Sequence, residues 1–217
     1  RCLWPGSSFF NQLGADRSRR GCGADWCGRG NSDVAQTSGA ILWFSIPRFR
    51  EGEFGGVFTI DIGDAPPPDN VPISYDEGRF WLVNLGDKDV NDERQPKDAQ
   101  GSPVYAQTKG IKALYKICVH LGCIYKWVPT NNRFECPCHG SKYLPSGVRV
   151  DGPARRNLDA FIVQAVDANG KMLAETQALE GSLEASAIEL PLGTVALKVN
   201  TGKRITGTIN SKPGGGR

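Results

Sequence analysis

The sequence predicts an all-β fold, either a small antiparallel barrel or a sandwich. Short segments with strand-like patterns recur along the chain, and turn-forming residues separate them. The composition agrees, because 27 glycines and 14 prolines among 217 residues favour loops and strands. We find no internal repeat and no long helical period. The chain is long enough to bury a core, as one large or two small domains.

Residues 1–50 are expected to form an irregular extension. The first forty are rich in glycine, serine and arginine and show little periodicity, so they are poorly suited to build a core. The apolar stretch from Ala40 to Ile46 is followed by Pro47. It has about a third of the length that a bilayer-spanning helix needs. We expect a core strand or an apolar pad there.

Residues 51–200 are expected to form the folded domain. Apolar patterns predict strands at residues 54–62, 79–84, 103–107, 112–117, 160–166, 171–174 and 194–199. Three prolines between Asp64 and Asp69 predict a turn, and Asn169-Gly170 favours a hairpin. The charged residues 87–100 should form an exposed loop. Residues 201–217 carry four basic side chains and no acidic one, which predicts a flexible basic tail.

The overall charge and the cysteine content limit the possible function. A formal charge of +3 is too small to suggest a nucleic-acid partner. Covalent c-type haem is excluded, because no Cys-x-x-Cys-His motif occurs. Cys22 and Cys27 are placed to close a small disulfide loop, and Cys2 is left over. Structural disulfides would indicate an oxidising, extracytoplasmic compartment.

The only two histidines of the chain lie inside two cysteine-containing motifs. These motifs read Cys118-Val-His120-Leu-Gly-Cys123 and Cys136-Pro-Cys138-His139-Gly-Ser141. Each motif pairs a cysteine with a histidine at short spacing and keeps one further cysteine. Two thiolates and two imidazoles are the ligands of a Rieske 2Fe–2S centre, in which one iron carries two cysteines and the other two histidines. The motifs therefore indicate electron transfer.

Histidine ligands suit a centre that accepts electrons readily. A neutral imidazole binds iron through one nitrogen and keeps its other N–H available. Replacing two thiolates by imidazoles removes negative charge, so the reduction potential rises above that of an all-cysteine cluster. Reduction makes the cluster more negative and strengthens proton binding on an exposed imidazole. Such a centre can accept the equivalent of a hydrogen atom from a hydroquinone.

Three other interpretations compete with this one. Zinc also binds two cysteines and two histidines. Zinc fingers, however, usually pair cysteine with cysteine and histidine with histidine along the chain, and the extra cysteines would be unexplained. A purely structural disulfide cluster would make the histidine spacing a coincidence. A Rieske-type oxygenase needs further histidines for a mononuclear iron, and the chain has none to spare.

At these residues the chain closely resembles the Rieske iron–sulfur subunit of cytochrome bc and bf complexes. The resemblance is specific over residues 112–165, which include both motifs and Gly152-Pro-Ala154. It implies a base of antiparallel sheets with an inserted cluster-binding subdomain at about residues 112–157, whose tip bears the metal. It also implies that Cys118 and Cys136 hold the inner iron.

The resemblance assigns roles to the remaining residues of both motifs. The outer iron is expected on His120 and His139, and a disulfide is expected between Cys123 and Cys138. In the family, hydroxyl groups at the positions of Ser141 and Tyr143 bond a bridging sulfide and a ligand cysteine sulfur, which raises the potential. Leu121 should cap the cluster, and His139 should face quinol and accept its proton. Trp127 is expected only to pack behind the loop.

Two residues depart from the family pattern. Val119 stands where threonine is usual between the first cysteine and histidine, and Arg155 follows Gly152-Pro-Ala154 in place of a proline. Losing one hydroxyl and one proline would loosen the packing around the cluster. A rim arginine would also change the electrostatic field at the docking surface.

The predicted function is that of a Rieske electron carrier with one 2Fe–2S cluster. It would take an electron and a proton from quinol at a cytochrome b subunit and reduce a c-type cytochrome, as part of a quinol-oxidising oxidoreductase. We expect it on the extracytoplasmic side of an energy-transducing membrane, in a periplasm, lumen or intermembrane space. Membrane association would come from an anchor outside this sequence or from the complex. The alternatives are a Rieske ferredoxin, the small subunit of another oxidase, or a zinc-binding interaction module.

Overall fold

The computed structural model describes residues 54–209, except 99, 106 and 179–183. Expectations for residues 1–50, including the Cys22–Cys27 loop, and for the last eight residues lie outside this part. The described elements, in chain order, are β1 (Val57–Asp61), η1 (Ile62–Asp64), β2 (Ile73–Tyr75), β3 (Phe80–Leu85), α2 (Asp87–Val90), β4 (Gly110–Tyr115), β5 (Lys126–Val128), η2 (Pro129–Asn131), β6 (Arg133–Glu135), β7 (Lys142–Tyr143), β8 (Arg149–Asp151), β9 (Ala160–Val166), β10 (Met172–Glu175) and β11 (Ala196–Ile205).

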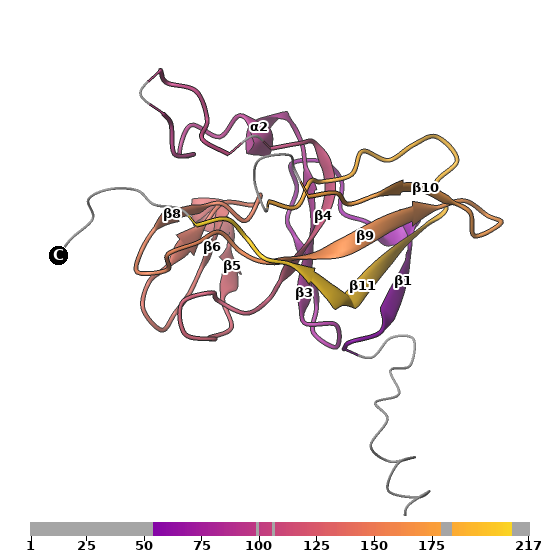
Figure 1. Cartoon of the computed structure of the whole chain (residues 1–217), viewed down its shortest axis with the longest axis horizontal. Helices are drawn as coiled ribbons and strands as arrows, with labels where there is room; N and C mark the ends of the chain where they lie inside the picture. The colour runs from indigo at the N-terminus through magenta and orange to yellow at the C-terminus, as the bar shows by residue number, and fades with distance from the viewer. Residues whose placement is uncertain (1–53, 99, 106, 179–183, 210–217) are drawn as a thin grey trace, which may run out of the picture. The chain divides into compact units, whose positions relative to one another are not determined.

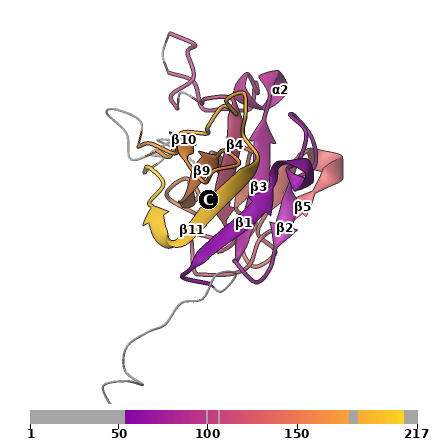
Figure 2. The ribbon, with the colours of Figure 1, turned by 90° about the vertical axis from the view of Figure 1, so that its right-hand side faces the viewer.

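The larger sheet has seven strands and is antiparallel throughout. Its order is β1-β11-β9-β4-β3-β2, with β10 paired to β9 (Figures 1 and 2). β1 alternates buried and exposed residues, as a strand with one solvated face does. The interior of β4 is instead buried at four successive positions, so both faces of this strand are covered. The predicted all-β, antiparallel fold is confirmed.

The smaller sheet has four antiparallel strands in the order β5-β6-β7-β8. All four lie between β4 and β9 in the chain, so this sheet is an insertion between two neighbouring strands of the larger one (Figure 1). The inserted subdomain implied by the resemblance is therefore present. Its strands are too short to have been predicted singly.

A buried cluster joins the inserted sheet to the larger one. It contains Leu114 of β4 together with Phe134 and Tyr143 of the small sheet, none of which is exposed to solvent. The ring of Trp127 packs against Phe134 with centroids 5.0 Å apart, which agrees with the packing role expected for it. Burial of these large rings is the dominant favourable contribution to docking the two sheets.

Most predicted strands are confirmed with small changes of boundary, but two expectations are wrong. The described residues between 103 and 107, which are all but 106, form no strand, and of these only Pro103 makes an isolated bridge, to Lys97. A proline lacks the amide that a regular ladder needs. The predicted tail at residue 201 begins too early, because β11 runs on to Ile205. Thr201 is buried there, and Arg204 lies 3.5 Å from the buried carboxylate of Asp159.

The charged segment after β3 contains the short helix α2 instead of only a loop. The carboxylate of Asp69 accepts hydrogen bonds from the backbone amides of Lys88 and Asp89 at its start. Asp89 itself is 4% exposed. Burial, reinforced by the nearby charges of Asp69 and Asp92, raises the pKa of Asp89 to about 6.

Asp89→Asn is expected to stabilise the protein at neutral pH. The folded protein binds a proton at Asp89 more tightly than the unfolded chain, so the carboxyl favours folding below about pH 4 and loses that contribution as the pH rises through about 6. The asparagine variant should gain up to about 2–3 kcal/mol over the natural chain at pH 7.5, and much less at pH 4.5. Urea unfolding at both values measures this, with the exposed Glu93→Gln as the control. An equal effect of Asp89→Asn at both pH values would contradict the shifted pKa.

Candidate metal centre

The first cysteine–histidine motif forms a tight loop directly after β4. The backbone amide of Cys118 donates to the carbonyl of Cys123 at 2.7 Å, and the amide of Gly122 donates back to the carbonyl of Cys118 at 3.0 Å. Gly122 has a φ of 83°, a conformation that suits glycine. The two bonds close the loop and hold His120 between them.

The second motif, between β6 and β7, repeats this construction. The amide of Cys136 donates to the carbonyl of Ser141 at 2.8 Å, and the amide of Gly140, whose φ is 74°, donates to the carbonyl of Cys136 at 3.0 Å. In both loops the first cysteine bonds the fifth residue after it, and a glycine precedes that residue. The two loops therefore present a buried cysteine and a histidine in similar ways.

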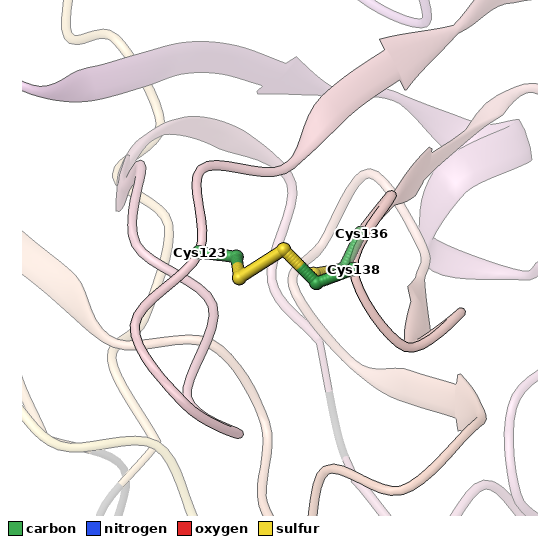
Figure 3. Close-up of side chains that lie close together, drawn as sticks. All are labelled: Cys123, Cys136 and Cys138. Carbon is green, nitrogen blue, oxygen red and sulfur yellow. A yellow bond between two sulfur atoms is a disulfide. The ribbon is translucent and has the colours of Figure 1, made fainter.

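A disulfide between Cys123 and Cys138 joins the two loops, as expected (Figure 3). Figure 3 also places Cys136 beside the bridge, and the sulfur atoms of these three cysteines lie within 4.8 Å of one another. This trio is not itself a metal site, because the bridged sulfurs of Cys123 and Cys138 cannot act as thiolates. Among the described residues the free cysteines are Cys118 and Cys136, both buried.

The two imidazoles meet at the tip of the paired loops. The ring centroids of His120 and His139 are 4.8 Å apart and the rings are nearly perpendicular, at 85°. His139 is exposed and His120 is half-buried. The Nδ1 atom of His120 is fully buried and has no hydrogen-bond partner within the described structure. Because buried polar atoms are normally satisfied, this orphaned nitrogen suggests a bound group.

The thiol of Cys118 lies at the bottom of the site, against Tyr143 of β7. Its sulfur is 3.2 Å from the Tyr143 hydroxyl. Burial raises the pKa of Cys118, and the hydrogen bond from Tyr143 acts in the opposite direction. Burial also raises the pKa of Tyr143, so its hydroxyl stays protonated and can donate to a sulfur anion. Tyr143 therefore lies in contact with a cysteine sulfur, and its bond to a cluster ligand stays a prediction.

Ser141 is fully buried, and its hydroxyl accepts a hydrogen bond from the amide of Ala154 at 3.2 Å. Gly152 packs so closely that a Cβ there would meet the Cα of Ser141 at 2.4 Å. The Gly152-Pro-Ala154 segment therefore supports the second loop from behind. The predicted bond from Ser141 to a bridging sulfide stays a prediction, and so does the capping role of Leu121, which is 70% exposed at the tip.

These residues fit a 2Fe–2S cluster with mixed ligands. The two disulfide-linked loops supply two buried thiols and two adjacent imidazoles, and one ring nitrogen of these imidazoles is buried without a partner. A Rieske cluster takes this donor set, with the cysteines on one iron and the histidines on the other. A zinc site would use the same atoms but would leave the matched geometry of the two loops and their disulfide without a role.

Comparisons with known proteins agree with the geometry. Residues 80–163 match the protein family described as Rieske [2Fe-2S] domain. Cytochrome b6-f complex iron-sulfur subunit 3 of Nostoc is 32% identical over 145 residues, which cover 62% of this chain and 74% of the relative. Subunit 2 of Trichormus variabilis is 30% identical over 169 residues, covering 73% of this chain and 85% of the relative. The chain belongs to the Rieske iron–sulfur subunit family.

A chloroplast relative has a higher identity over a shorter stretch. The cytochrome b6-f complex iron-sulfur subunit of Bigelowiella natans is 44% identical over 80 residues, 34% of this chain. The match spans only 31% of the length of that relative. Membership of the Rieske family identifies the cofactor as one 2Fe–2S cluster and the chain as an electron-transport protein.

Sequence reasoning missed a buried ion pair behind the Rieske site. Lys112 and Glu184 are each 1% exposed, and Lys112 lies in the middle of β4. The alternation around Lys112 only indicated a strand, and a lysine in a strand is usually solvated. No signal in the sequence connects it with Glu184.

Tyr143→Phe is expected to lower the midpoint potential of the Rieske cluster. The change removes one hydrogen bond to a charged sulfur, which contributes at most about 1.5–3 kcal/mol, or roughly 65–130 mV for one electron. A redox titration followed by EPR measures the shift. Tyr125→Phe is the matched control, because the Tyr125 hydroxyl is bonded to the carbonyl of Tyr115 and not to sulfur. An unchanged potential would mean that Tyr143 only packs.

Proposed function

We propose that this Rieske protein takes an electron and a proton from a quinol at a cytochrome b subunit and passes the electron to a c-type cytochrome. The relatives are subunits of cytochrome b6-f complexes by name, which supports a quinol-oxidising complex as the setting. Of the alternatives, the ferredoxin and the small oxidase subunit receive no support from these names.

The observation that carries the proposal is the exposed imidazole of His139 on an apolar tip. Leu121 and Ile124 are 70% and 57% exposed in the same loop region. Exposed apolar groups of this size favour docking on another surface. With Leu121 and Ile124 docked on a partner surface, the His139 ring would be the group of this chain nearest to the bound quinol.

We propose Cys118 and Cys136 as ligands of the inner iron and His120 and His139 as ligands of the outer one. When bound, the 2Fe–2S cluster supplies one-electron redox chemistry. The ring nitrogen of His139 that does not bind iron would have to carry no proton, and it would then accept a hydrogen bond and the proton from the quinol hydroxyl. Tyr143 would meanwhile hold its hydroxyl on Cys118 and stabilise added negative charge. The disulfide keeps the two loops together throughout.

We also propose that the protein works on the extracytoplasmic side of its membrane. The disulfide between Cys123 and Cys138 supports this, because structural disulfides persist in oxidising compartments. In the part of the chain that the structure describes, no helix has the length and apolar character to cross a bilayer.

His139→Cys is expected to abolish quinol oxidation by the assembled complex. A thiolate at this position cannot accept the quinol proton as the imidazole does and adds negative charge to the centre. Turnover of a short-chain quinol analogue with a soluble c-type cytochrome as acceptor measures the effect, and the exposed Lys126→Gln serves as the control. Unchanged turnover would refute the role given to His139.

The midpoint potential of the purified Rieske protein separates the proposal from its closest alternative. Rieske centres span about −150 to +300 mV. We expect a value in the upper part of that range, because Tyr143 is in contact with the sulfur of Cys118. A potential below about −100 mV would favour a low-potential ferredoxin instead. A colourless, zinc-containing preparation would exclude both.

A further inference from the structure

Behind the Rieske site, a buried ion pair connects the two sheets. The Nζ atom of Lys112, in β4 of the larger sheet, donates to the carbonyl of Ser146 at 2.9 Å and lies 3.5 Å from Oε1 of Glu184. Ser146 lies in the turn between β7 and β8 of the inserted sheet, and it is fully buried. A charge from one sheet therefore holds the backbone of the other.

The carboxylate of Glu184 extends this connection to a second point. Its Oε2 atom accepts hydrogen bonds from Nδ2 of Asn157 at 3.1 Å and from the hydroxyl of Thr208 at 2.7 Å. The side-chain oxygen of Asn157 in turn accepts the backbone amide of Arg149, the first residue of β8, at 2.9 Å. Lys112 and Glu184 thus hold the turn before β8 and the start of β8 together.

The contacts of Lys112 and Glu184 with the turn and with β8 also hold the strand that carries Tyr143. In the small sheet Tyr143 of β7 pairs with Arg149 of β8, so the strand that carries the phenol is paired with the strand that the ion pair holds. The turn itself is closed by bonds between Leu144 and Val148 and between Gly147 and Leu144, each 2.9 Å long. A shift of this turn away from β4 would carry Tyr143 with it.

The energetics do not favour this pair as a simple stabiliser. Taking two charges out of water costs several kcal/mol per ion, and well-packed apolar side chains of similar volume often replace such pairs without loss. Burial lowers the pKa of Lys112, while the charge of Glu184 opposes that shift. A buried pair that is costly to form, yet fixes one backbone carbonyl, suits a positional role.

We propose that Lys112, held by Glu184, is a positioning residue for the Rieske centre: it fixes the turn at Ser146 and so keeps the Tyr143 hydroxyl on the sulfur of Cys118. This inference rests on the proposed cluster site. Lys112 would then influence the redox potential without contacting the ligands. It would do so by keeping one hydrogen bond in place, from the Tyr143 hydroxyl to sulfur.

The test uses the loaded protein and a double-mutant cycle. Lys112→Met with Glu184→Gln removes the donor to Ser146 without leaving a lone buried charge, and it keeps an oxygen that can accept from Asn157 and Thr208. We expect the midpoint potential to fall, in the same direction as for Tyr143→Phe and by no more. In a Tyr143→Phe background the same pair of changes should cause no further fall, because the effects of substitutions at coupled residues do not add.

The Tyr143→Phe background is the control for an effect of charge, because a change of buried charge acts on the cluster whether or not the Tyr143 hydroxyl is present. Should the paired variant not fold, Gly147→Ala displaces the same turn, because Gly147 has a φ of 89° and a Cβ there would meet Leu114 at 2.9 Å. It should also lower the potential, and again only while Tyr143 is present.

Two results would overturn the inference. An unchanged potential in a folded Lys112→Met/Glu184→Gln protein would leave the pair a structural role only. An equal fall in potential with and without Tyr143 would mean that Lys112 acts through its charge. If the natural protein contained no cluster, the proposed metal site itself would be wrong. Failure of the proposed function can therefore be distinguished from failure of this inference.

Discussion

Cys136→Ser is expected to yield a protein without a Rieske cluster. Cys136 is 3% exposed and is one of the two free cysteines among the described residues, so no other thiol there can take its place. A serine hydroxyl is a much weaker ligand than a thiolate for an iron–sulfur cluster. Iron, acid-labile sulfide and the visible absorption should fall to background, and Cys118→Ser should behave in the same way.

Val119→Thr is the control for this prediction. It lies in the first loop, directly between Cys118 and His120, and replaces a methyl group by a hydroxyl of similar size. The variant should retain its full content of iron and sulfide. A Cys136→Ser protein with the iron content of the natural one would exclude Cys136 as a ligand.

Loss of the disulfide is expected to have the second-largest effect. The bridge between Cys123 and Cys138 closes a loop with a sequence separation of 15 residues. In the chain-entropy account a bridge of that span stabilises a protein by about 3 kcal/mol. The Cys123→Ser/Cys138→Ser variant should therefore release its cluster at a clearly lower urea concentration. The loss of visible absorption measures this release.

Chemical reduction of the natural protein provides a matched comparison without mutation. A thiol reductant that opens the bridge should reproduce the lower urea midpoint of the double-serine variant and should not shift that variant further. Equal midpoints for the natural, reduced and double-serine proteins would show that the loops stay together without the disulfide.

The sequence was most informative where chemistry restricts the choice of residue. Both histidines and the loop cysteines could be singled out together, because iron ligands must be particular side chains at particular spacing, whereas the role expected for Tyr143 came from the family resemblance. The long strand β9 followed from its apolar pattern, and the hairpin to β10 followed from its Asn-Gly turn. The strand and the hairpin depend on neighbouring residues alone.

What escaped prediction depends on contacts between distant residues. The strands of the small sheet are two or three residues long, too short for a period to be recognised. The extension of β11 to Ile205 is explained by pairing with β9, where Arg204 and Ile205 oppose Phe161 and Ala160. The pair of Lys112 and Glu184 is formed by residues 72 positions apart.

Pulsed EPR of the reduced Rieske protein tests the central claim most directly. The claim is that His120 and His139 bind one iron of a 2Fe–2S cluster while Cys118 and Cys136 bind the other. Protein grown with ¹⁵N-labelled histidine should show strong couplings from two histidine nitrogens to the reduced cluster. A reduced cluster without histidine coupling, or a preparation without iron and acid-labile sulfide, would contradict it.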